Sequence, residues 1–388
     1  MYEQWAHYAV RLFHLIAGIM WIGTSFYFVW LDGSFQPLAE KKEGTEGETY
    51  MVHGGFFYRV EKQKPLHMPK VLHWFKYEAL LTWVSGIFLL GLVYWAGGGL
   101  ALMGHAPFAM TQWTAIGISV GSLLVAWTIY DLLWKFVGAR APNVALGVSL
   151  LLLVSMIHSY CKLFPGRAAY IHVGAMLGTI MVSNVWMRIL PPQRRMIAAS
   201  VEGREPNWAE GAAAKQRSLH NSYITIPVLI TMLSNHFSFV FDHPRNDVLL
   251  ALLVVVGASV RHFMITHEKK KTAMWTLVPA LGGLAIAFWM TMPVTIPPDH
   301  TPPVAFAEAN AIITTRCRSC HSSTPTDDVF HSPPNGITFD APDSVRALAP
   351  RIRLRVVEAG TMPFANKTNM TPEEREILRR WIDQGARL

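Results

Sequence analysis

Long apolar runs are the feature that most constrains this chain. Hydrophobic residues make up 51% of it and charged residues only 15%. A helix needs about 20 apolar residues to cross some 30 Å of hydrocarbon. Eight runs approach that length, at 8–30, 78–96, 113–136, 142–161, 168–190, 219–241, 247–265 and 274–292. The sequence therefore predicts an all-α protein in which residues 1–292 form a polytopic membrane bundle of about eight spans. The first run is too long for a signal-peptide core and is counted as a span.

The distribution of Lys and Arg predicts how the bundle is oriented. Basic residues gather in alternate connections: 31–77, the segment around Lys135 and Arg140, the segment from Arg188 to Arg217, and that from Arg261 to Lys271. Such loops stay on the cytoplasmic side of a membrane. Both termini are thus expected in the periplasm of a bacterial inner membrane. The net charge of +8 reflects this asymmetry and gives no reason to expect a nucleic-acid partner.

One short motif near the C-terminus, Cys317-Arg318-Ser319-Cys320-His321, is typical of covalent c-type haem attachment. Cys317 and Cys320 would form the thioether bonds, and the His321 imidazole would bind the iron. A zinc site would need a second cysteine pair, which a chain with three cysteines lacks. A thioredoxin-like dithiol would need a βαβ pattern, which is absent from the sequence.

The residues around this motif predict a small soluble domain. Prolines in 293–304 indicate a stiff linker, and 305–388 is expected to be a class I-like cytochrome c domain. Met362 is the preferred second axial ligand, since a thioether opposite histidine raises the haem potential. Met370 is the competitor, but it lies against the cap of the last helix, where Thr371 and Glu374 predict a capping box.

Local patterns give three further expectations. The segment from Tyr50 to Val60 reads as a hairpin with a Gly-Gly turn, apolar enough to fold back over the cytoplasmic helix ends. Asp131 and Lys135 are spaced for an i, i+4 ion pair. The fifth apolar helix is expected to stop at Pro191.

Four histidines fall in the outer half of the expected bundle, on different helices: His14, His158, His172 and His236. Facing imidazoles in a bundle are suitable ligands for a b-type haem. The alternative is that they cap helices or bond backbone carbonyls, and the sequence leaves both open. A relay cofactor would be needed only if substrate were oxidised near the cytoplasmic surface, because electrons would then have to cross about 30 Å.

Five stretches of the membrane half have a distinctive sequence: Gly54-Gly55-Phe56-Phe57-Tyr58, Leu72-His73-Trp74-Phe75-Lys76, Asn184-Val185-Trp186, His220-Asn221 with Tyr223 and Thr225-Ile226-Pro227-Val228, and Ser234-Asn235-His236. Together they resemble the membrane-bound urate hydroxylases (PuuD type), which carry a helical membrane domain and a C-terminal cytochrome c. The resemblance implies oxidation of urate to 5-hydroxyisourate with oxygen from water. It also implies that electrons pass to the fused haem, then to a soluble cytochrome c or terminal oxidase.

Two groups of residues could bind a flat purine anion, which needs a cation, polar donors and a base. The preferred inner set is Arg261, His262, His220, Asn221 and Asp131, with the hairpin as its cover, since purine breakdown is cytoplasmic. The outer set is Arg11, His14, Asn235 and His236. Two other classes of protein remain open: a haem protein passing electrons from quinol to cytochrome c, and a transporter with a redox-sensing domain.

Overall fold

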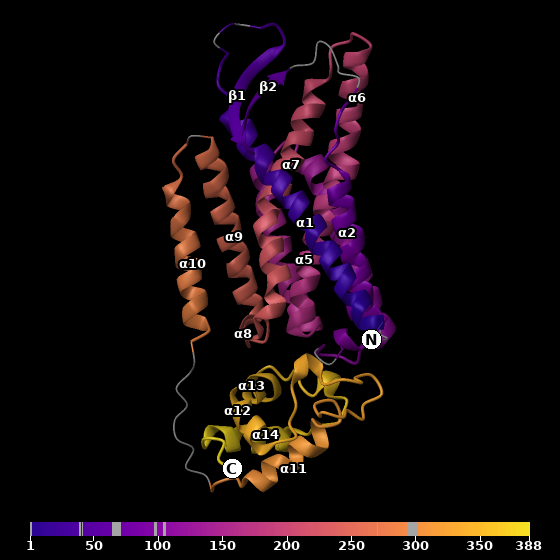
Figure 1. Ribbon diagram of the computed structural model, residues 1–388, viewed down its shortest axis with the longest axis vertical. Helices are drawn as coiled ribbons and strands as arrows, with labels where there is room; N and C mark the ends of the chain where they lie inside the picture. Colours follow the sequence, from indigo (N-terminus) through magenta and orange to yellow (C-terminus); the bar gives the residue numbers. More distant parts are fainter. Residues whose placement is uncertain are drawn as a thin grey trace.

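A computed structural model describes residues 2–38, 40, 42–63, 71–96, 99–103, 106–269, 271–292 and 302–388. The described chain is mostly helical and consists of a long helical bundle with a smaller domain beneath one end (Figure 1). The start of helix α1 lies at the same end of the bundle as that domain, while the hairpin and helix α6 lie at the other (Figure 1).

Within the described residues, nine helices of twelve or more residues build the bundle. They are α1 (Tyr2–Ser34), α2 (Tyr77–Leu90), α3 (Gln112–Leu132), α4 (Pro142–Leu163), α5 (Gly166–Ser183), α6 (Leu190–Val201), α7 (Trp208–Leu233), α9 (Asn246–Glu268) and α10 (Leu277–Met290), with the short α8 (Ser238–Phe241) before α9. Six helical segments of the described chain are long and apolar enough to cross a membrane. They are Trp5–Ser34, Tyr77–Trp95, Gln112–Val137, Pro142–Leu163, Gly166–Val201 and Asn246–Glu268.

The expected total of eight spans is not confirmed. Helix α7 has 26 residues but is not among these six segments, and its first half contains Lys215 and Arg217. It begins at Trp208 and ends at Leu233, some ten residues ahead of the run expected at 219–241. The segment Met274–Met290 is apolar but shorter than the six. Both nevertheless run alongside the other long helices (Figure 1).

Helix α5 is the centre of the bundle. Its residues are mostly buried, and it packs against α7, α3 and α4. Small residues make this possible: a Cβ added at Gly174 would lie 2.3 Å from the Thr231 Oγ1 atom of α7. A larger side chain at position 174 would therefore force α5 and α7 apart.

The prediction that the fifth helix stops at Pro191 is wrong. A π-helical turn, η4 (Asn184–Ile189), follows α5 and leads directly into α6. Pro191 and Pro192 occupy the first turn of α6, where proline's missing N–H is tolerated. The helical path therefore continues to Val201.

The hairpin forms as predicted, with strands β1 (Thr45–His53) and β2 (Phe56–Gln63) paired antiparallel. Gly54 and Gly55 have φ angles of +59° and +83°, which suit glycine. The hairpin lies against the end of α1, as expected: the Tyr27 hydroxyl of α1 is 3.6 Å from the Met51 sulfur of β1, and Lys62 of β2 forms an ion pair with Asp32 of α1. Phe56 and Phe57 at its tip are 70% and 85% exposed.

The C-terminal domain has its own hydrophobic core. Helices α11 (Phe306–Arg316), α12 (Pro342–Ala347), α13 (Ala349–Ile352) and α14 (Pro372–Asp383) surround it. Leu378 and Trp381 of α14 are buried there beside Ile313 of α11. Residues 293–301 of the predicted linker 293–304 lie outside the described residues.

Candidate functional site

A cavity of about 970 Å³ lies between the small domain and the nearby end of the bundle. Its size is at the upper end of the range of about 300–1,000 Å³ typical of small-molecule and cofactor sites. Side chains from both bodies line it, so it has a C-terminal wall and a bundle wall.

The C-terminal wall contains every residue predicted to hold a c-type haem. Cys317, Cys320, His321 and Met362 all line the cavity, and neither cysteine is in a disulfide. The His321 Nδ1–H donates to the Ile337 carbonyl at 3.1 Å. The other ring nitrogen, Nε2, is then the one that can bind an iron. Burial lowers the pKa of His321 and so favours the neutral imidazole, the form that binds metals.

The two thiols are unlike those of a redox-active pair. Burial raises the pKa of the Cys317 thiol to about 12, and it also raises the pKa of Cys320. A reactive dithiol needs a lowered pKa, because the thiolate is the nucleophile. The electrostatics therefore disfavour a thioredoxin-like role.

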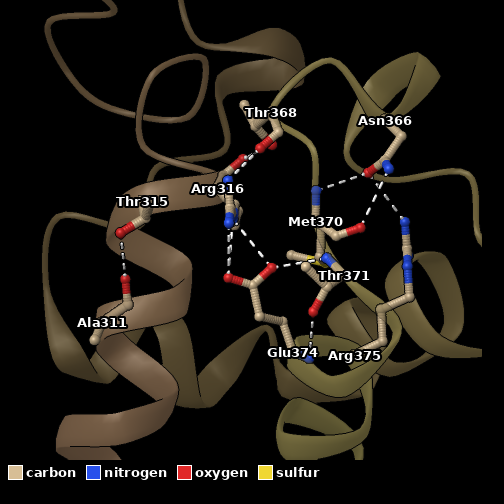
Figure 2. A network of polar contacts seen from close by, with 9 residues as sticks. All are labelled: Ala311, Thr315, Arg316, Asn366, Thr368, Met370, Thr371, Glu374 and Arg375. Atoms are coloured by element: carbon tan, nitrogen blue, oxygen red, sulfur yellow. Dashed lines mark hydrogen bonds and ion pairs between the residues drawn. The ribbon is translucent and has the colours of Figure 1, made fainter.

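A polar network connects the helix before Cys317 to the loop after Met362 (Figure 2). The Arg316 Nε–H donates to the Glu374 carboxylate at 3.0 and 3.1 Å, and Thr368 Oγ1 donates to the Arg316 carbonyl at 2.9 Å. Glu374 and Thr371 form the predicted capping box of α14. The network thus fixes the Cys317 side and the Met362 side of the C-terminal wall relative to each other.

Met362 and Met370 occupy different environments within this domain. Met362 lines the cavity, and its carbonyl accepts from the Arg375 Nη1 atom at 2.7 Å. Met370 is not a lining residue, is 3% exposed and packs in the domain core. Both backbone polar atoms of Met370 are bonded to the Asn366 side chain.

The bundle wall of the cavity combines apolar residues with a group of polar and basic ones. It contains His7 and Arg11 of α1, Arg167 of α5, Asn235 and His236 of the turn η5 (Ser234–His236), and Asp242. The Arg167 Nε–H donates to Asn235 Oδ1 at 2.9 Å. Three of the four residues in the predicted outer set, Arg11, Asn235 and His236, therefore lie at one cavity; His14 is not among its lining residues.

A direct ion pair joins the two walls. The Arg355 Nη1 atom, in the turn η8 (Arg353–Glu358), lies 2.7 Å from Asp242 Oδ2. Asp242 is only 3% exposed. Burial raises its pKa to about 6, and the charges of Arg355, Arg351 and Arg167 oppose this shift without cancelling it.

The other three outer-half histidines have separate partners. His14 Nδ1–H donates to the Thr82 carbonyl at 2.9 Å, and His158 Nδ1 lies 2.8 Å from the Asp247 carboxylate with its side chain 57% exposed. His172 is fully buried, with Nδ1 2.7 Å from the Ala168 carbonyl and Nε2 2.6 Å from Ser119 Oγ. His172 thus has the backbone-bonding role that the sequence left open.

The predicted inner set divides into two groups on either side of α7. The first contains His220 and Asn221, joined through Tyr130 and Asn184, and Asp131, whose partner Arg217 lies 5.0 Å from the centre of the Tyr130 ring. The Tyr130 hydroxyl is 2.7 Å from His220 Nδ1, and Asn184 Nδ2–H donates to Tyr130 at 3.2 Å and to Asn221 Oδ1 at 2.9 Å.

Asp131 does not pair with Lys135, as its spacing suggested. Its carboxylate accepts from Arg188 Nε at 2.7 Å and from the Arg217 Nη2 atom at 3.1 Å. Lys135 lies instead over the Phe136 ring. Asp131 and Arg217 are both buried, so two guanidinium groups from other helices neutralise one buried carboxylate.

The second inner group contains Arg261 and His262 of α9. Arg261 is fully buried; its Nη2 atom donates to Ser222 Oγ at 2.8 Å and its guanidinium lies 3.9 Å from the centre of the Phe26 ring. His262 Nδ1 is 2.7 Å from the Tyr223 hydroxyl. These contacts lie across the α7–α9 packing surface, away from the residues joined to Asp131.

Sequence reasoning missed Arg167, His7 and Asp242 as cavity residues. Arg167 lies in the first turn of α5 and Asp242 directly follows α8. A charged residue beside a connection that is otherwise poor in Lys and Arg was the sequence signal that could have identified them. Within the described ranges, no group of three or more His, Cys, Asp or Glu residues is arranged to hold a metal ion.

The fold and the site are those of a helical protein, compatible with a membrane location, that has a separate C-terminal domain. Several long apolar helices are compatible with a membrane protein, and a separate domain carrying a Cys-x-x-Cys-His motif covers one end of the bundle. The sequence profile of the family described as urate oxidase N-terminal matches residues 1–292 of the 388. The chain belongs to this family, which implies an oxidoreductase in urate-related oxidation. No curated protein and no solved structure matched the chain.

Proposed function

We propose that this protein oxidises urate to 5-hydroxyisourate in a bacterial inner membrane and passes the electrons to a c-type haem in its C-terminal domain. Family membership supports the urate chemistry. The observation that carries the electron-transfer part is the shared cavity, since the Cys-x-x-Cys-His motif and the polar end of the bundle line one space.

The residues of the C-terminal wall fit a covalently bound haem. Cys317 and Cys320 would hold it through thioether bonds, and His321 and Met362 would bind the iron. When bound, it supplies a one-electron acceptor. The remaining work falls to the chain: Ile337 orients the His321 ring, and the Arg316–Glu374 pair supports the wall behind Cys317. A b-type haem among His14, His158, His172 and His236 stays a separate prediction.

The proposed orientation puts both termini in the periplasm. The start of α1 and the C-terminal domain lie at one end of the bundle, and the basic hairpin region lies at the other, in agreement with the charge asymmetry (Figure 1). A C-terminal domain in the periplasm could hand electrons to a soluble cytochrome c or a terminal oxidase.

The reaction balances without dioxygen. Urate and water give 5-hydroxyisourate with release of two protons and two electrons. The protein must therefore bind an anionic purine, accept protons and deliver electrons one at a time to the C-terminal domain. Both the inner and the outer sets contain a cation, an amide and histidines.

Anaerobic membranes containing the protein test this function. Addition of urate should produce the absorbance band of reduced c-type haem, and 5-hydroxyisourate should form in proportion. A quinol is the comparison substrate. Reduction by quinol with no response to urate would show a haem electron-transfer protein and refute the urate reaction. A pyridine haemochrome spectrum would count c-type and b-type haem in the same sample.

A further inference from the structure

The cavity between the two bodies carries an unbalanced positive charge. Its lining contains seven Lys or Arg residues and one carboxylate, Asp242. Asp242 is paired directly with Arg355, while Arg316 and Lys367 pair with acidic groups behind the wall. Within the described part of the chain, no carboxylate forms a direct ion pair with Arg11, Arg167 or Arg351.

Arginines without a carboxylate partner that face a partly enclosed cavity favour the binding of an anion there. Arg351 stands on the C-terminal wall with the haem motif, where the propionate groups of a haem would supply negative charge. Arg11 and Arg167 stand on the bundle wall. Two anions of different origin would therefore satisfy the two walls.

The bundle wall also has groups that suit a flat heterocycle. The side-chain oxygen of Asn235 accepts a hydrogen bond from Arg167. The side-chain NH₂ of Asn235 can then donate to a ligand carbonyl. His236 lies next to it and is exposed to the cavity. Tyr94 and Phe241 provide apolar surface on the same wall, against which a purine ring can pack.

We infer that the bundle wall of this cavity, with Arg11, Arg167, Asn235 and His236, binds the anionic purine. This inference rests on the proposed function and assigns its substrate site to the outer end of the bundle, in place of the preferred inner set. The inner residues are closely packed and do not line this cavity: Asp131 accepts from Arg188 and Arg217, and Arg261 donates to Ser222 beside Phe26, while the Nη1 atoms of Arg217 and Arg261 are buried without a hydrogen-bond partner.

The location simplifies the electron path. The purine and the Cys317–His321 motif would share one cavity, so electrons need not cross about 30 Å of bilayer through a relay. Water adds at C5 of urate, two electrons leave in single steps toward the C-terminal domain, and an external cytochrome or oxidase removes them in turn. His236 accepts one of the two released protons and returns it to the outer solution, which receives the other.

The test compares variants of the two walls and of the inner set in the full-length haem protein. Arg11→Gln and Arg167→Gln should raise the KM for urate about ten- to a hundredfold, as expected for a lost hydrogen bond to a charged group. Haem content and reduction potential should stay unchanged. Arg351→Gln should instead lower the potential with little effect on KM. Arg194→Gln, an exposed arginine of α6, is the matched control.

The inference is overturned if Arg11→Gln and Arg167→Gln leave KM unchanged, or if they move the potential alone. It is also overturned if His220→Gln raises KM while the two outer variants do not. In each case wild-type protein still reduces its haem with urate, so the proposed function survives. Failure of the wild type to respond to urate would refute that function itself.

A sidedness measurement gives an independent answer. Urate is an anion and crosses a bilayer slowly. Added outside right-side-out spheroplasts, it should reduce the haem without a lag, whereas inverted vesicles should respond only after permeabilisation. The opposite pattern would move the substrate site to the inner end.

Discussion

The two ends of the bundle treat their charged residues in opposite ways. At the end that carries the hairpin, the Asp131 carboxylate is buried between Arg188 and Arg217, and Arg261 lies on the Phe26 ring with Ser222 as its acceptor. At the end next to the C-terminal domain, Arg11 and Arg167 face a cavity and form no direct ion pair with a described carboxylate. The ion pairs of Asp131 hold helices together, whereas basic groups that line an open cavity are available to a ligand.

The largest loss of activity is expected from replacing the two cysteines of the haem motif. Replacing Cys317 and Cys320 by Ala should abolish covalent haem attachment and all urate-dependent reduction, because no thioether can form. Haem staining of the denatured protein measures this directly. Cys161→Ala is the matched control, since Cys161 is buried in the bundle core and should only pack. Covalent haem in the double variant would exclude this attachment site.

Asp131→Asn should affect stability and leave substrate affinity intact. Removing one charge of a buried ion pair costs about 3–5 kcal/mol, because Arg217 would remain buried without its partner. Thermal unfolding in detergent should therefore shift to lower temperature. The KM of the fraction that folds should equal that of the wild type. A raised KM at normal stability would instead support an inner substrate site.

Variants of Met362, in the cavity wall, and Met370, in the domain core, should have different effects. Met362→Ala should lower the haem reduction potential, since a thioether ligand raises it. Met370→Ala should leave the potential unchanged but destabilise the domain by about 2–5 kcal/mol, the usual cost of emptying a core position. Redox titration and chemical unfolding measure the two effects. An exchange of these phenotypes would identify Met370 as the ligand.

The smallest effect concerns pH at the joint between the two bodies. Burial raises the pKa of Asp242 from its ordinary value of 3.8 to about 6. The carboxyl of Asp242 is therefore neutral below about pH 6 in the docked protein, and above it the carboxylate pairs with Arg355. The stabilising contribution of the neutral carboxyl is full below about pH 4 and is lost as the pH rises through 6. The amides around Asp242 and Arg355 should be less protected at pH 7 than at pH 5, when their hydrogen exchange is compared with the intrinsic rate at each pH.

Asp242→Asn serves as the control for this effect, because an amide does not titrate in this range. The variant should show the same exchange at both pH values, apart from the intrinsic chemical rate. An unchanged pH dependence in the variant would assign the effect to another group.

Interactions between residues close in the chain could be predicted from the sequence. The Gly54-Gly55 turn produced its hairpin, and Thr371 with Glu374 formed the capping box. Most of the apolar runs correspond to helices for the same reason, since length and composition are local properties. The spacing of Cys317, Cys320 and His321 likewise put three side chains at one cavity.

Long-range contacts could not be predicted in this way. Asp131 had Lys135 as its neighbour on the same helix, but its partners Arg188 and Arg217 come from other helices. The depth of His158 was readable, whereas its rotation toward Asp247 was not. The cavity itself depends on how a separate domain sits against the bundle, for which a single sequence contains no direct signal.

The Asp242–Arg355 bridge has a kinetic consequence. The proposed reaction space is bounded by two bodies, so urate must arrive and product must depart along the seam between them. Any movement that separates the two bodies would therefore change the access of urate to this space and its distance from the electron acceptor at the same time. The Asp242–Arg355 contact would thus hold the electron acceptor in place and also control access to the cavity.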